Sequence, residues 1–137
     1  MVNISLADWH TFLDHGRKYM RTAHRGTLRP EKFTNDLIMQ LAAMGIENLL
    51  VGLWQFFGHL PEDHTLSGLV DGMMAFCPLP DSLADGIKAI EDMDDLCALV
   101  PVNHRTPSNN DIAVLLETGE GLLRFTDQRL AEQARAS

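Results

Sequence analysis

Three arginines separated by four positions, Arg17, Arg21 and Arg25, stand beside His24 near the start of the chain. Residues four apart lie on one face of a helix, so this spacing stacks three guanidinium groups in a row. Guanidinium forks match phosphate oxygens, which makes such a face suitable for an RNA backbone, a nucleotide phosphate or an acidic partner. The alternative is a solvated face whose cations favour the C-terminal end of their helix.

A second cluster of reactive side chains occupies the segment after position 58. Two imidazoles and two carboxylates fall within six residues: His59, Glu62, Asp63 and His64. They could form a metal or acid/base site. No third histidine follows nearby, and a polar loop in which His64 orients the next helix explains the same pattern. We therefore predict no metal and no cofactor.

Glu47 is a carboxylate in the middle of an apolar segment. A buried carboxylate suits proton transfer, but it more often takes a hydrogen-bond or arginine partner that fixes the packing. Arg105 is the candidate partner from the other end of the chain. Either role requires helices that bring the two residues together.

The elements that position these residues are all predicted to be helices. Apolar residues recur with helical period and never alternate with period two, so no sheet is expected. We expect helices from Ser5 to about Arg25, from Pro30 to Phe57, from Thr65 to Met74, from Asp81 to about Leu99, and from Ser108 or Asn109 to about Glu132. The predicted architecture is all-α, an up-and-down antiparallel bundle of four long helices plus a short one in a single domain, 1–137, with residues 132–137 frayed.

The segment Phe33–Phe57 is the predicted centre of this bundle because it is apolar around most of its circumference. It is long enough to span a membrane, but Glu47 and Asn48 at its centre argue against a span. Apolar residues also interrupt its polar side, at Met44, Val51 and Trp54. These three predict a homodimer interface.

The composition limits the classes of function. A formal net charge of −8 opposes indiscriminate binding to nucleic acid. Six of the eleven basic residues nevertheless lie between Arg17 and Lys32, so one end of the fold can attract phosphate. Cys77 and Cys97 show neither zinc-ligand nor disulfide spacing, and the N-terminus lacks a secretion signal, so we expect a cytoplasmic protein.

The order of these features resembles the HEPN family, small all-helical domains associated with nucleotide binding. The matching elements are a first helix with Tyr and Ala, a second helix with Glu, a glycine followed by a His-X-Leu loop, and a later loop with Arg. In this chain they are Tyr19, Ala23, Glu47, Gly58, His64-Thr65-Leu66 and His104-Arg105-Thr106. The resemblance implies a HEPN-like bundle, a ligand site that includes Glu47, His64, His104 and Arg105, and a nucleotidyltransferase partner in a toxin-antitoxin pair.

Two departures from the family pattern direct the functional prediction. Asn48 stands where the family commonly has Lys, and the positions after Arg105 that hold a catalytic histidine in ribonuclease members are Asn110, Asp111 and Ile112. We therefore predict a non-catalytic module that binds a nucleotide, RNA or a partner protein. The alternatives are a divergent ribonuclease using Arg105 with His104, a metal-dependent hydrolase using the His59–His64 loop, and a dimeric scaffold.

Overall fold

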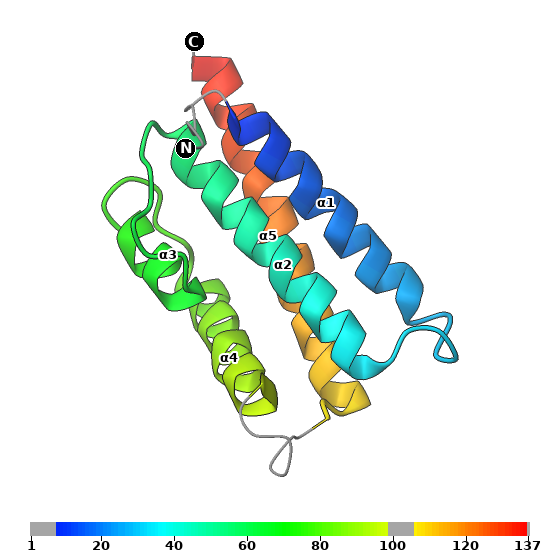
Figure 1. Ribbon diagram of the computed structural model, residues 1–137. Coiled ribbons are helices and arrows are strands. Elements are labelled where there is room, and N and C mark those ends of the chain that lie inside the picture. Colours follow the sequence, from blue (N-terminus) through cyan, green and yellow to red (C-terminus); the bar gives the residue numbers. More distant parts are fainter. Residues whose placement is uncertain (1–7, 99–105, 137) are drawn as a thin grey trace, which may run out of the picture.

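Every regular element in the described part of the chain is an α-helix. The computed structural model describes residues 8–98 and 106–136, without the side chains of 94–98. Its helices are α1 (Trp9–Gly26), α2 (Asn35–Phe56), α3 (Leu66–Met73), α4 (Asp81–Ala98) and α5 (Asn109–Ala136). No strand occurs within those ranges, which confirms the predicted all-helical class. Figure 1 shows α1, α2 and α5 running side by side, with α3 and α4 beyond α2.

Local side-chain chemistry sets the helix starts. The hydroxyls of Thr34 and Thr65 each accept a hydrogen bond from the backbone N–H three positions later, at 3.2 and 3.0 Å. At α5 the capping is reciprocal: Ser108 Oγ accepts from the Asp111 N–H, and Asp111 Oδ2 accepts from the Ser108 N–H, both at 3.0 Å. Each bond satisfies an N–H that has no partner within its helix. Ser108 is thus the cap of the last helix.

Two predicted boundaries are wrong. Helix α2 begins at Asn35 rather than Pro30, because Thr34 adopts an extended backbone and provides the cap. The preceding residues form a turn, in which the Phe33 N–H donates to the Arg29 carbonyl at 2.9 Å. Helix α5 continues to Ala136, so residues 132–136 are helical rather than frayed. The predicted start of the first helix at Ser5 lies outside the described residues.

Helix α2 is the centre of the core and contacts all four other helices. Its large side chains that are at most 2 % exposed include Ile38, Ile46, Leu49, Leu50 and Leu53. By length and composition α2 is the one helix in the described ranges that is apolar enough to cross a membrane, with a mean hydropathy of 1.5. In this structure 56 % of that window is buried inside the protein. Packing against the other helices accounts for its apolar character.

Glycines set the distance between α1 and α2. A Cβ atom at Gly52 would lie 2.6 Å from Leu13 Cδ2, and one at Gly16 would lie 2.7 Å from Leu49 Cγ. Both contacts are shorter than van der Waals separation, so the two backbones approach each other only because these positions lack a side chain. Leu13 faces Gly52 while Gly16 faces Leu49, so the helices run in opposite directions.

The three residues of α2 that were predicted to form a dimer interface differ in how exposed they are. Val51 is 2 % exposed. Trp54 Nε1 donates to the Leu69 carbonyl of α3 at 3.0 Å, and its ring meets Phe76 edge to face. Val51 is therefore buried and Trp54 half-buried within the chain, and the dimer interface itself stays a prediction. Met44, 44 % exposed, is the predicted interface residue that remains on the surface.

Candidate functional site

A hollow of about 410 Å³ between α1 and α5 contains most of the predicted arginine face. We call it the α1–α5 hollow. Its lining residues are Arg17, Arg21 and His24 of α1, and Glu120, Leu123, Arg124 and Asp127 of α5. Arg25 is exposed and does not line it. The structure thus brings two of the three predicted arginines to one concave surface.

Ion pairs across the hollow fix how the two helices face each other. Arg17 Nη2 lies 2.5 Å from Asp127 Oδ1, and His24 Nε2 lies 2.8 Å from Glu120 Oε1. The imidazole contact has the distance of an ion pair but not the angle of a hydrogen bond. Arg17 precedes His24 on α1, whereas its partner Asp127 follows Glu120 on α5. The two helices therefore run in opposite directions.

The same register places Arg124 of α5 in the hollow with Arg21 of α1. Both side chains are exposed, and neither forms an ion pair with any carboxylate in the described ranges. Asp127 is paired with Arg17, and Glu120 lies against the His24 imidazole. Two guanidinium groups from different helices therefore remain available to an anion.

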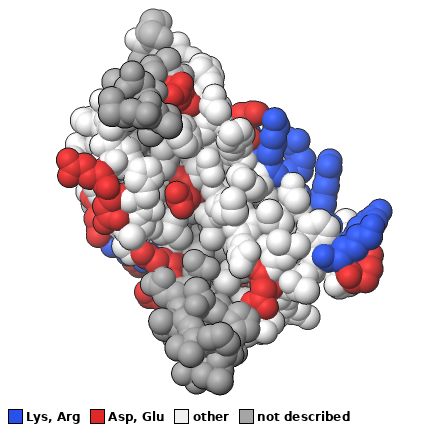
Figure 2. Space-filling model, viewed as in Figure 1, with Lys and Arg blue, Asp and Glu red and all other residues white. Residues whose placement is uncertain are grey.

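The basic residues that cluster in the sequence between Arg17 and Lys32 also cluster on the surface. Figure 2 shows Lys and Arg gathered along the edge formed by α1 and the loop after it, whereas Asp and Glu lie mainly over α3 and α4. Opposite charges at opposite edges let a protein of net charge −8 attract an anion locally.

A second hollow, of about 370 Å³, contains two residues singled out by the family resemblance. We call it the α2–α3 hollow. His64 Nδ1 lies 4.0 Å from Glu47 Oε2, and the two side chains are 49 % and 47 % exposed. The other lining residues are Gln40, Ala43, Met44, Thr65, Leu66 and Glu91. Glu47 is thus a surface residue of a shallow site, not the buried group that its apolar sequence context suggests.

The start of α3 holds His64 in place. Asp63 Oδ1 accepts a hydrogen bond from the Thr65 N–H at 2.9 Å, and this bond lowers the pKa of Asp63. Glu91 of α4 accepts from the Ser67 N–H at 2.8 Å and from the Ser67 hydroxyl. These contacts fix the backbone on both sides of the imidazole, so the Glu47–His64 approach is a defined feature of the fold.

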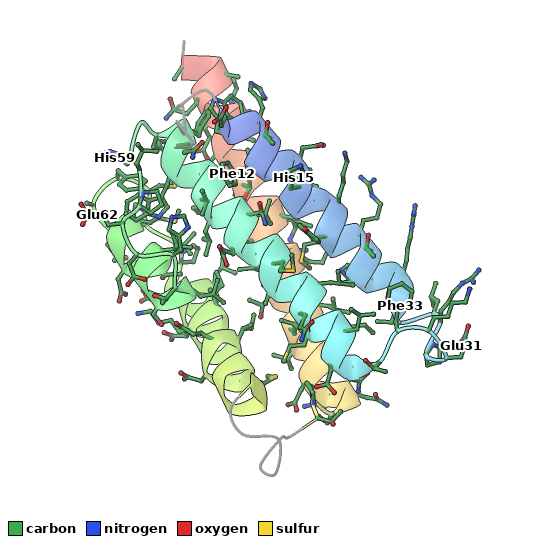
Figure 3. All side chains as sticks on the ribbon, viewed as in Figure 1. Phe12, His15, Glu31, Phe33, His59 and Glu62 are labelled. Carbon is green, nitrogen blue, oxygen red and sulfur yellow. The ribbon has the colours of Figure 1, made fainter. Side chains whose placement is uncertain are left out.

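The remaining predicted residues fall into two groups. His104 and Arg105 lie outside the described residues, so the predicted approach of Arg105 to Glu47 stays a prediction. The ring of His59 stacks on Phe76, with centroids 4.2 Å apart, while His64 turns toward Glu47. Figure 3 shows His59 and Glu62 in the loop between α2 and α3. No group of three His, Cys, Asp or Glu residues with metal-binding geometry occurs among the described positions.

These features define a class, an all-helical protein with a basic, ligand-sized hollow between its first and last helices. No protein-family model, curated protein or solved structure matches the chain.

Proposed function

We propose that this protein is a non-catalytic, HEPN-like module that binds the phosphate groups of a nucleotide or RNA in the α1–α5 hollow. The observation that carries the proposal is the pair Arg21 and Arg124, which face one hollow from separate helices without a described carboxylate partner. Two guanidinium groups can approach one phosphate from two sides with charge-assisted hydrogen bonds.

The charges around this pair favour a bound anion. The lining contains three arginines against two carboxylates, Glu120 and Asp127, and Arg17 is paired with Asp127. The volume of about 410 Å³ falls within the usual range for small-molecule sites. Because both arginines are exposed, the attraction should weaken with added salt.

The directions of the helices support the HEPN-like, up-and-down antiparallel bundle as part of this proposal. Helix α1 opposes both α2 and α5, as the Leu13–Gly52 and Arg17–Asp127 contacts indicate. Helix α4 opposes α5, since Gly86 approaches Thr118 while Leu83 approaches Gly121. The family resemblance supplies the association with nucleotides, and the hollow supplies a place for one.

The test is isothermal titration calorimetry with ATP and with a short single-stranded RNA. Arg21→Ala and Arg124→Ala should each weaken binding about tenfold, since a hydrogen bond to a charged group contributes about 1.5–3 kcal/mol. Arg25→Ala is the matched control, because Arg25 lies on the same helix and outside the hollow. Its effect should stay within about twofold, as expected for an exposed charge away from the ligand. No binding by the wild-type protein, or an equal loss in all three variants, would refute the proposal.

Two protein partners belong to the same proposal: a second copy of the chain, predicted from the apolar residues on the polar side of α2, and a nucleotidyltransferase in a toxin-antitoxin pair, implied by the resemblance. Met44, exposed beside the α2–α3 hollow, is the residue that suits a dimer contact. Light scattering should give a dimer mass for the wild-type protein and a monomer mass for Met44→Asp. A monomeric wild-type protein would reject the dimer, and a neighbouring nucleotidyltransferase gene would support the second partner.

A second candidate function rests on the Glu47–His64 pair. A carboxylate 4.0 Å from an imidazole is an arrangement that can move a proton, so the α2–α3 hollow could support RNA cleavage without a metal. This candidate predicts cleavage of single-stranded RNA that persists in a chelator and is lost in both His64→Ala and Glu47→Gln. Absence of cleavage by the wild-type protein would reject it.

A further inference from the structure

An apolar hollow of about 450 Å³ lies at the end of the α1–α5 seam. We call it the apolar hollow. Its lining combines the loop after α1 with the first turns of α2 and α5: Gly26, Thr27, Pro30, Phe33, Asn35, Ile38, Asn109, Ile112, Ala113 and Leu116. Figure 3 places Phe33 at the base of that loop, with Glu31 at its outer side. One aromatic ring, aliphatic walls and a few amides are the features of a site for a flat, partly polar molecule.

Two asparagines give this hollow a directed polar edge. Asn35 Nδ2 donates to the Pro107 carbonyl at 2.9 Å and to Asn109 Oδ1 at 3.0 Å. An amide nitrogen carries two hydrogens, so both donors of Asn35 are used. Asn35 Oδ1 remains as an acceptor and Asn109 Nδ2 as a donor. A nucleobase edge carries hydrogen-bonding groups of both kinds and can pair with such amides.

The apolar hollow and the α1–α5 hollow lie one after the other along the same two helices. On α1, Gly26 lines the first and His24 the second, and the hydroxyl of Thr27, just after α1, donates to the His24 carbonyl at 2.6 Å. On α5, Leu116 lines the first and Glu120, one turn later, the second. With a helical rise of 1.5 Å per residue, about 8 Å separate Gly26 from Arg21, and about 12 Å separate Leu116 from Arg124. A base, a ribose and a short phosphate chain cover such a span.

We infer that the ligand is a purine nucleotide whose base occupies the apolar hollow and whose phosphates reach Arg21 and Arg124. The inference rests on the proposed phosphate site and adds the chemical class of the ligand. The occupant follows from charge complementarity, because one end of the seam is apolar with an amide edge and the other is cationic. A volume of about 450 Å³ has room for a fused two-ring base. Adenine and guanine share this chemistry, and the experiment separates them.

The experiment measures binding of ATP, GTP, CTP, UTP and inorganic tripolyphosphate to the full-length protein by calorimetry. One purine triphosphate or both should bind at least about tenfold more tightly than CTP, UTP and tripolyphosphate, because burying the larger base adds apolar area and hydrogen bonds. Comparison of ATP with GTP identifies the base. Equal affinity for all four nucleotides would overturn the inference.

Variants separate the base site from the phosphate site. Asn109→Ala should weaken purine triphosphate binding about fivefold or more without changing tripolyphosphate binding, since it removes an amide and leaves both arginines. Asn110→Ala, an exposed neighbour outside the hollow, is the matched control and should change neither. Arg21→Ala should weaken both ligands.

The pattern of failures identifies which proposal is wrong. If tripolyphosphate or RNA binds and depends on Arg21, but purine nucleotides bind no better than tripolyphosphate, the base site is wrong and the phosphate site stands. If neither tripolyphosphate, nucleotides nor RNA bind, the proposed function is wrong and the inference falls with it. Circular dichroism and thermal melting of each variant test whether it remains folded, so that a loss of affinity can be separated from unfolding.

Discussion

Gly52→Ala tests whether the close approach of α1 and α2 depends on a missing side chain. The new Cβ would lie 2.6 Å from Leu13 Cδ2, 2.8 Å from Leu13 Cγ and 3.2 Å from the Leu13 backbone nitrogen. Leu13 is only 1 % exposed, so its side chain has no free space into which to turn. The helices must separate or the core must repack.

The expected magnitude comes from two opposing terms. Overpacking a core costs about 1–3 kcal/mol. Replacing glycine by alanine within a helix gains about 1 kcal/mol through helix propensity. Gly121→Ala, in α5, isolates the first term, because a Cβ there would meet Leu83 Cδ1 at 3.5 Å, an ordinary van der Waals distance. The propensity gain is common to both variants, so their free energies of unfolding should differ by about 1–3 kcal/mol, with Gly52→Ala the less stable.

The assay is urea denaturation followed by far-UV circular dichroism, analysed by linear extrapolation for the wild-type protein and both variants. Gly121→Ala should match or exceed the stability of the wild-type protein. A difference between the two variants below about 0.5 kcal/mol, the usual error of additivity, would show that the α1–α2 contact accommodates a methyl group. In that case the close approach of α1 and α2 would not depend on the missing side chain at Gly52.

Three further predictions use the same denaturation assay. Gln55→Met should raise the free energy of unfolding by about 1 kcal/mol, because Gln55 is 2 % exposed and its Oε1 has no hydrogen-bond partner among the described residues; a decrease would contradict this. Ser108→Ala should lower it by about 1 kcal/mol through loss of the α5 cap, whereas an unchanged value would mean that the cap contributes nothing. Asp63→Asn tests the hydrogen bond from the Thr65 N–H, which lowers the pKa of Asp63. This bond stabilises the fold when the pH is above the usual carboxyl pKa of 3.8, and the stabilisation is lost as the pH falls through the lower pKa of the folded protein. The wild-type protein should therefore be the more stable near neutral pH, and the difference should shrink below about pH 4; a constant difference would refute the assignment.

Much of the secondary structure follows from local sequence. Apolar periodicity located all five helices, and Gly58, which adopts a φ of 84°, follows α2 at the predicted end. The errors arose where two local signals competed. Pro30 is a suitable first helical residue, but Thr34 caps the helix instead, and the intervening residues form a turn. Gln55 lies on the polar side of a helical projection, yet the surrounding packing buries it.

The candidate sites, like the helices, could be predicted only in part from local sequence. The spacing of Arg17 and Arg21 was visible in the sequence because it is a property of one helix. Arg124 could not be found from spacing, since its partnership with Arg21 depends on how α5 aligns with α1, about a hundred positions away in the chain. Asn35 and Asn109 meet for the same reason, at the starts of two helices separated by most of the sequence. No local pattern marks either pair.

By itself, the sequence determined the helical class, the central position of α2 and the charge division between the two edges, because periodicity, apolar length and the order of charges are local properties. The tertiary structure decided which side chains share a surface. Glycines at the α1–α2 contact and ion pairs across the α1–α5 seam set the helix alignment. That alignment placed residues far apart in the sequence around a basic hollow and an apolar hollow, because such hollows form only where distant helices pack together.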